Sequence, residues 1–280
     1  MSSATDSGPR GEELFVRQRY DARKPLFISI YGRKGSGKSH LAERFWADWP
    51  RQYSALVIDP TGDFVAGDDI DDLTDPLPYR LELPSPGDPG TRWRYRPDMG
   101  SATVDDDLDR AVGLAFYVDK QIPFLLVIDE DHVVARVNHT GPNMRRIYYE
   151  ARHRNLSVIT CGPRPVQVNP LQLSQSDYVY IFALPHPLDQ DRVAATCGID
   201  PARLREAIAG LGTHEYLRFD AAPDANQVAL VAHSEGISEQ EARDALTVIH
   251  MPALPPNGRL ANYHTRTTAL DAGSTERQTR

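Results

Sequence analysis

The stretch that decides the fold is residues 32–39, Gly32-Arg33-Lys34-Gly35-Ser36-Gly37-Lys38-Ser39. It matches the pattern GxxxxGK[ST] at every fixed position. An apolar, β-rich run from Leu26 to Tyr31 precedes it, and residues 39–49 carry Leu41, Phe45 and Trp46 at helical spacing. A strand that enters such a loop and a helix that leaves it are the setting of a phosphate-binding loop. An ordinary glycine-rich turn explains the stretch poorly.

The chemistry of this loop predicts a bound nucleoside triphosphate, ATP, together with Mg²⁺. Glycines let the backbone wrap the phosphates with its N–H groups turned inward, and the helix N-terminus adds positive potential. We expect Lys38 to reach the β- and γ-phosphates and Ser39 to ligate the metal. The predicted nucleotide-binding residues are Gly32, Lys34, Gly35, Ser36, Gly37, Lys38, Ser39 and His40.

A second motif follows an entirely apolar strand, Phe124 to Ile128, as Asp129-Glu130. Asp129 stands at the carboxyl end of that strand, where it is expected to complete the magnesium shell beside Ser39. Glu130 comes directly after it and is predicted to orient and deprotonate the water that attacks the γ-phosphate. A solvated acidic cap is the alternative, but the pairing with the phosphate loop favours hydrolysis. A kinase needs no such base, since its nucleophile is the acceptor.

An arginine-rich segment lies before the next strand, with Arg145, Arg146, Arg152 and Arg154 around a single glutamate, Glu150. Three interpretations stay open on the residues alone. The arginines can form a solvated helix face, contact DNA phosphates, or reach the γ-phosphate of a neighbouring subunit as an arginine finger does. After the following strand, Arg164 and Gln167 are candidates for a γ-phosphate sensor.

Alternating strands and helices predict an α/β fold with a parallel, doubly wound sheet and a small C-terminal addition. The expected organisation is an N-terminal arm (1–20), an ATPase domain (21–235) and a C-terminal helix with a polar tail (236–280). Residues 67–100 are expected to form an irregular insertion in that domain. The last strands are predicted at Glu215–Phe219 and Val228–Val231.

The composition is that of a globular protein, with 40% hydrophobic and 25% charged residues and no apolar run long enough to span a membrane. A cytoplasmic location with two reduced cysteines is therefore expected. The net charge of −8 argues against a monomer that coats DNA by bulk attraction. Seven aspartates lie between Asp59 and Asp75, so the excess is local and leaves room for a basic groove elsewhere.

Across residues 25–195 the motifs and their order resemble the FtsK/HerA superfamily of DNA-pumping ATPases, including viral genome-packaging ATPases. The resemblance rests on the phosphate loop, Ile58-Asp59-Pro60 with Gly62-Asp63-Phe64, the Asp129-Glu130 strand, Arg164-Pro165, and Asp189-Gln190-Asp191-Arg192. It implies a RecA-like (ASCE) P-loop NTPase that works as a ring, with Arg152 as the finger between subunits. Because Arg152 ends a predicted helix that leads into a strand, we expect it to emerge near the nucleotide-bearing rim. Arg154 and Arg145 are the fallback candidates. The family usually carries Gln before the Arg-Pro pair, whereas Cys161-Gly162-Pro163 stands here.

These observations together predict an ATP-hydrolysing ring, a hexamer, that moves double-stranded DNA for genome packaging or DNA transfer. Its catalytic residues are predicted to be Lys38, Glu130 and Arg152. A viral capsid vertex or a membrane-associated portal is a possible partner. Two alternatives remain, a nucleotide-gated binding module with little turnover and a small-molecule phosphotransferase.

Overall fold

The computed structural model describes residues 25–65, 70–73, 90–221 and 248–251, with scattered positions between 229 and 242. The predicted N-terminal arm, the polar tail and most of the insertion lie outside these residues. Within the described residues, no helix combines the length and the apolar character that crossing a bilayer requires.

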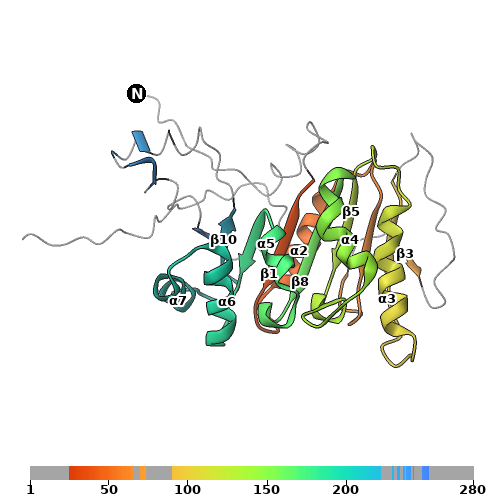
Figure 1. Ribbon diagram of the computed structural model, residues 1–280, viewed down its shortest axis with the longest axis horizontal. Coiled ribbons are helices and arrows are strands. Elements are labelled where there is room, and N and C mark those ends of the chain that lie inside the picture. The colour runs from red at the N-terminus through yellow and green to blue at the C-terminus, as the bar shows by residue number, and fades with distance from the viewer. Residues whose placement is uncertain are drawn as a thin grey trace, which may run out of the picture.

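A nine-stranded sheet in the order β11-β10-β9-β1-β8-β5-β2-β4-β3 organises the molecule (Figure 1). The strands from β9 to β3 run parallel, and β10 and β11 are antiparallel additions at one end. The strands are β1 (Phe27–Tyr31), β2 (Ala55–Ile58), β3 (Ile70–Leu73), β4 (Arg92–Tyr95), β5 (Phe124–Ile128), β8 (Leu156–Gly162), β9 (Tyr178–Ile181), β10 (Tyr216–Asp220) and β11 (Val248–Met251). The parallel α/β fold predicted from the sequence is confirmed.

Helices cover both faces of the sheet. On one face α2 packs on alternate residues of the central strands, such as Ile28, Val57 and Val127. On the other face lie α3 and α4 at one end and α5, α6 and α7 at the other (Figure 1). The helices are α2 (Lys38–Asp48), α3 (Val104–Gly113), α4 (Pro142–Glu150), α5 (Pro170–Gln175), α6 (Pro187–Cys197) and α7 (Pro201–Ala209).

Short elements join these layers. They are the 3₁₀ turns η1 (Leu114–Phe116), η2 (Asp131–Val133), η3 (Ala151–His153) and η4 (Pro165–Gln167), and the small ribbon of β6 (Ala135–Arg136) and β7 (His139–Thr140). Helices α3 and α4 each continue directly into a 3₁₀ turn, η1 and η3. The strand beside β10 is β11, which lies within the predicted C-terminal helix and tail. The predicted strand Val228–Val231 lies almost entirely outside the described residues.

Strand β4, within the predicted insertion, fixes the end of the helix that follows the phosphate loop. The guanidinium of Arg92 donates to the carbonyl oxygens of Trp46 (2.6 Å) and Trp49 (2.5 Å) and lies 5.3 Å from the ring centroid of Trp46. These carbonyls end α2, so a buried cation meets the negative end of its dipole. Burial lowers the pKa of Arg92 to about 10, so it stays charged.

Arg92→Met should lower the free energy of unfolding by about 2–4 kcal/mol, because two buried carbonyl groups lose charged donors. Urea denaturation followed by circular dichroism measures this loss. Arg203→Met, on the exposed surface of α7, is the control and should change stability by less than about 0.5 kcal/mol. Equal stability of the two variants would contradict the capping role of Arg92.

Both cysteines are free, Cys161 buried in β8 and Cys197 half-buried at the end of α6. Burial raises the pKa of the Cys161 thiol well above its usual range and that of Cys197 to about 12. Both thiols are therefore protonated in the folded state, and thiolate chemistry is suppressed.

Candidate nucleotide site

The phosphate loop lies at the carboxyl ends of β1, β8 and β9, between β1 and α2. The backbone N–H of Gly32 donates to the carbonyl of Gly162 at the end of β8, and that of Arg33 to Ala183 after β9. Gly35 and Gly37 have φ of 75° and 107°, a region that disfavours side chains. A Cβ on Gly32 would lie 2.6 Å from Cβ of Phe182, so only glycine fits there. The predicted loop is therefore built as a tight backbone cradle.

Two polar groups of this cradle are poorly satisfied by the protein. Lys38 is only 6% exposed, and the one contact described for its ammonium group is to the carbonyl of Arg33 at 3.4 Å. The hydroxyl oxygen of Ser36 is buried without a partner among the described residues. A buried ammonium group is costly unless an anion compensates it, and phosphate oxygens supply that charge. The residues present therefore fit a nucleotide phosphate chain, with Lys38 at its centre.

The remaining predicted nucleotide contacts surround this centre. Lys34 is exposed at the tip of the loop, and Ser39 and His40 lie in the first turn of α2. The ring of His40 faces Glu43 at 3.9 Å, so His40 would contribute its backbone N–H rather than its side chain.

Ser39 and Asp129 meet although 90 residues separate them. The hydroxyl of Ser39 lies 3.3 and 3.4 Å from the two carboxylate oxygens of Asp129. Burial, followed by the charges of Glu130 and Asp59, raises the pKa of Asp129 to about 6. A cation between Ser39 and Asp129 would offset the free-energy cost of burying the ionised carboxylate of Asp129. Mg²⁺ usually takes one or two protein ligands and completes its shell with phosphate and water, and this pair fits that need.

Glu130 has a left-handed backbone, with φ 53° and ψ 54°. Its carboxylate lies 3.2 Å from Nδ1 of His132. His132 in turn, together with Lys38 and Lys34, holds the pKa of Glu130 below its usual range. Glu130 is therefore an ionised base next to the lysines of the phosphate loop. His132 was not predicted, since a lone histidine two residues after a motif carries no specific signal.

Asp59 forms a turn instead of a free ligand. Its buried carboxylate accepts the backbone N–H groups of Gly62 (2.9 Å) and Phe64 (3.2 Å). These contacts use the Asp59 carboxylate to hold the turn that follows β2.

Arg152 lies at the edge of the sheet opposite the phosphate loop. It precedes β8 and donates to a carboxylate oxygen of Asp177 (2.9 Å), which precedes β9. Asp177 also accepts the backbone N–H of Phe27 at the start of β1. The expectation that Arg152 emerges at the nucleotide-bearing rim is therefore wrong, because a residue before a parallel strand lies at its amino end. The Arg152 side chain is 58% exposed, on the opposite edge of the sheet from the phosphate loop of its own chain.

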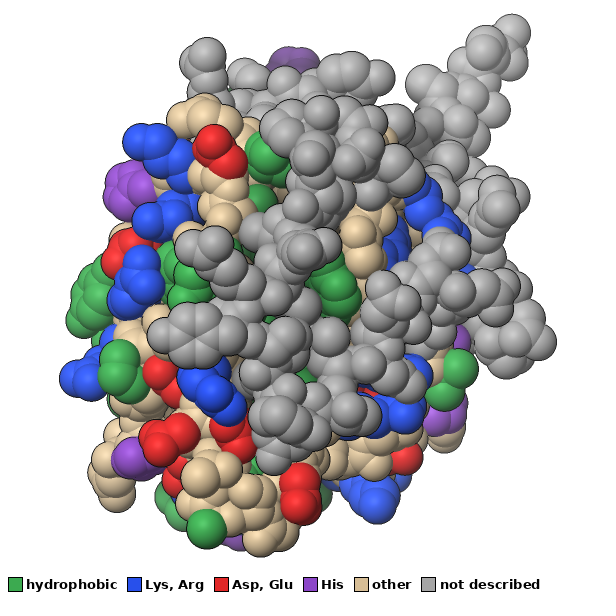
Figure 2. Space-filling model, turned by 90° about the vertical axis from the view of Figure 1, so that its right-hand side faces the viewer, with side chains coloured by type: hydrophobic (Ala, Val, Ile, Leu, Met, Phe, Trp, Pro, Cys, Tyr) green, Lys and Arg blue, Asp and Glu red, His purple; other side chains and the backbone are tan. Residues whose placement is uncertain are grey.

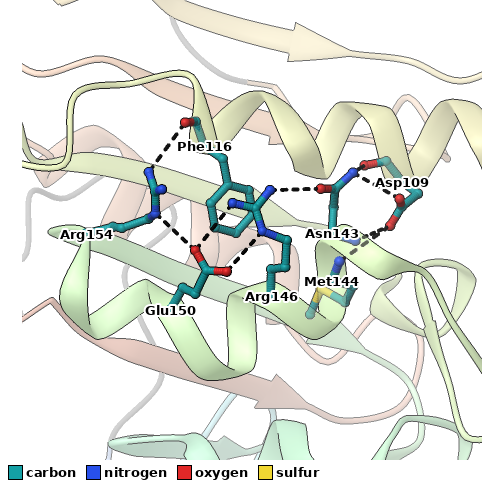
Figure 3. A network of polar contacts seen from close by, with 7 residues as sticks. All are labelled: Asp109, Phe116, Asn143, Met144, Arg146, Glu150 and Arg154. Atoms are coloured by element: carbon teal, nitrogen blue, oxygen red, sulfur yellow. Dashed lines mark hydrogen bonds and ion pairs between the residues drawn. The ribbon is translucent and has the colours of Figure 1, made fainter.

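Two of the other arginines are held within the subunit (Figure 3). Glu150 accepts from Arg146 (3.0 Å) and Arg154 (3.2 Å), and both guanidinium groups lie over the ring of Phe116. Arg154, a fallback for the finger, thus joins η1 to the end of α4. Arg145, the second, is exposed, and the described residues offer it no ion pair.

Comparison with solved structures shows the same fold in two proteins described as viral packaging enzymes. The genome packaging NTPase B204 from Sulfolobus turreted icosahedral virus 2, in complex with AMPPCP, matches with a TM-score of 0.57 and 15% identity, covering 82% of this chain and 98% of that one. B204, the DNA-packaging ATPase from Sulfolobus turreted icosahedral virus, matches with a TM-score of 0.55 and 14% identity, covering 83% and 100%. The chain has the P-loop NTPase fold. No protein-family model and no curated protein matches the sequence.

Arg164, one of the two sensor candidates, is engaged within the chain. Arg164 donates to the buried carboxylate of Asp189 at 2.9 Å, which ties η4 to the start of α6. Cys161, three residues before Arg164, is buried, and burial raises the pKa of its thiol. Strand β8 ends in Gly162, which has no side chain to sense a phosphate. Its carbonyl oxygen instead accepts the N–H of Gly32 at the start of the phosphate loop.

A residue of the P-loop NTPase that the sequence did not reveal is His214, between α7 and β10. Its Nδ1 lies 3.1 Å from the carbonyl of Ser36 and therefore carries the proton of that hydrogen bond. A separation of 178 residues and the lack of a motif hid this contact. This hydrogen bond supports the phosphate loop from the end of the sheet where the antiparallel strands lie.

Proposed function

We propose that the chain is an ATP-hydrolysing motor that assembles as a ring, a hexamer, and translocates double-stranded DNA during genome packaging or DNA transfer. The observation that carries the proposal is the buried ammonium group of Lys38 inside a glycine cradle, with Ser39–Asp129 and Glu130 beside it. A base after the metal-binding aspartate favours water as the nucleophile over a small acceptor. The fold shared with proteins described as packaging ATPases supports the choice of polymer.

In this proposal the ring completes the active site. Bound Mg²⁺ would draw charge from the γ-phosphate, with Ser39 and Asp129 as its protein ligands. Lys38 would hold the β- and γ-phosphates, and Glu130 would take the proton of the attacking water. A ring joins two different surfaces of neighbouring subunits, so Arg152 at the amino edge of one sheet can face the nucleotide edge of the next.

The distribution of charge limits how DNA can bind. Figure 2 shows basic and acidic side chains interspersed over the described part of the face that carries α3. Such a surface gives no single-sign field, in line with the net charge of −8. We therefore propose that DNA contacts come from loops that line the channel of the ring.

DNA-stimulated hydrolysis tests the proposal. Wild-type ATPase activity should rise on addition of duplex DNA, and the stimulation should fall as salt rises, because phosphate contacts release counterions. Lys38→Ala should lose nucleotide binding and turnover while remaining folded. Lys120→Ala, an exposed lysine outside the site, is the control and should behave as the wild type.

Two outcomes would contradict the proposal at different levels. Wild-type turnover in Lys38→Ala would remove the site assignment. Turnover that depends on Lys38 but ignores DNA at low salt would leave an ATPase and overturn the DNA motor.

A further inference from the structure

A buried polar cluster lies beneath the proposed base and takes no part in the chemistry described so far. Its centre is Asp131, fully buried and directly after Glu130. The side-chain amide of Gln172, on α5, donates to the Asp131 carboxylate and also lies 2.7 Å from the hydroxyl of Tyr31 and 3.0 Å from that of Thr160. Gln172 is itself fully buried. One glutamine therefore ties the loop after β5 to α5, β1 and β8.

The neighbouring end of β8 is shaped around the same carboxylate. A Cβ on Gly162 would overlap the side chain of Asp131. The carbonyl of Gly162 accepts the N–H of Gly32, where the phosphate loop begins. Asp131 is thus enclosed between Gln172 on one side and the backbone under the phosphate loop on the other.

This enclosure matters because of the backbone at Glu130. A non-glycine residue with φ 53° carries a steric cost and persists only where its surroundings impose it. Asp131 follows Glu130 directly, and its side chain is held in the interior by the hydrogen bond from Gln172. The turn of η2 also begins at Asp131. The direction in which the Glu130 carboxylate points is set by the same backbone.

We propose that Asp131, clamped by Gln172 and given room by Gly162, is a positioning element that holds Glu130 in its left-handed conformation and aims its carboxylate at the attacking water. The inference rests on the proposed function for the role of Glu130, while the conformational part stands on geometry alone. Gln172 and Gly162 act through Asp131 and touch no substrate.

The kinetic test uses two variants that disturb Asp131 from opposite sides. Gln172→Leu removes the donor, and Gly162→Ala pushes the carboxylate. Each should lower kcat about 10²-fold, as a misplaced catalytic group does, with KM and ATP affinity unchanged. In a Glu130→Gln background the same changes should have no further effect, because the group that they position is already lost.

Ser176→Ala is the matched control for a merely structural role. The hydroxyl of Ser176 belongs to the same buried cluster, 2.8 Å from that of Ser29 and from the carbonyl of Gln172, but the structure gives it no contact with Asp131 among the described residues. Its kcat should stay near the wild-type value. Equal losses in Ser176→Ala and Gln172→Leu, or additive losses with Glu130→Gln, would overturn the proposal.

A thermal test decides the conformational part without any hydrolysis. Glu130→Gly and Glu130→Ala both lack the carboxylate, but only glycine adopts φ 53° freely. The glycine variant should melt about 2 °C higher than the alanine variant. In the Gln172→Leu background this difference should vanish, because the loop can relax. A difference that persists would show that Gln172 does not impose the conformation. If the turnover of the wild-type protein did not depend on Lys38, the proposed function would fail. The melting temperatures would still test whether Gln172 imposes the conformation of Glu130.

Discussion

Arg152→Ala is expected to bind ATP almost as the wild type does and to hydrolyse it about 10³–10⁵-fold more slowly, the range of an arginine finger. The side chain lies at the amino edge of the sheet, half-exposed and paired only at the periphery with Asp177 and the carbonyl of Gln175. It cannot serve the nucleotide of its own subunit, so its effect must pass through an interface. Steady-state turnover and nucleotide binding, measured on assembled rings, separate the two quantities.

Mixing variants tests whether the arginine acts between subunits. Lys38→Ala subunits lack a working nucleotide site but retain Arg152, so adding them to Arg152→Ala subunits should restore part of the turnover. Arg203→Ala is the control, since Arg203 is exposed on α7 and is not a candidate for the finger. Absence of rescue, with both variants assembled, would place the finger elsewhere.

Glu130→Gln is expected to retain ATP and to lower hydrolysis about 10²–10⁴-fold, the usual contribution of a general base. The substitution leaves Ser39, Asp129 and Lys38 in place, so phosphate and metal binding should survive. Single-turnover kinetics with bound ATP measures the chemical step directly. Glu206→Gln, exposed on α7, controls for the change of charge. Loss of ATP binding in Glu130→Gln would instead make Glu130 a structural residue or a metal ligand.

The sequence was sufficient for the parts of the site that depend on local order. A phosphate loop needs a strand before it and a helix after it, and Asp129 needs a buried strand to bring it beside Ser39; both requirements are visible in short runs of residues. The parallel sheet follows from the same alternation. These predictions concern backbone geometry that neighbouring residues impose on each other.

The parts that were missed depend on contacts between distant segments. Gln172 stands in a six-residue helix with no motif and meets Asp131 across 41 residues. His214 reaches the phosphate loop from the far end of the chain. The error over Arg152 is of another kind, since its position before a parallel strand already assigns it to the amino edge. The direction of the chain could be read from the sequence, but Arg152 was assigned to the carboxyl edge of the sheet instead of the amino edge.

The rate at which the Cys161 thiol reacts can report how often the core around it opens. The residue lies in β8 with no exposed surface, opposite Ile30 in the strand that leads into the phosphate loop. Its side chain packs in the apolar cluster beneath α2, so a thiol reagent can modify it only when that part of the core opens. The rate of modification therefore measures how often the core opens. Cys197, half-buried on α6, is a second thiol closer to the surface, and its labelling rate serves as a comparison. Slower labelling of Cys161 with nucleotide present, at an unchanged rate for Cys197, would show how far ligand binding stiffens the centre of the molecule.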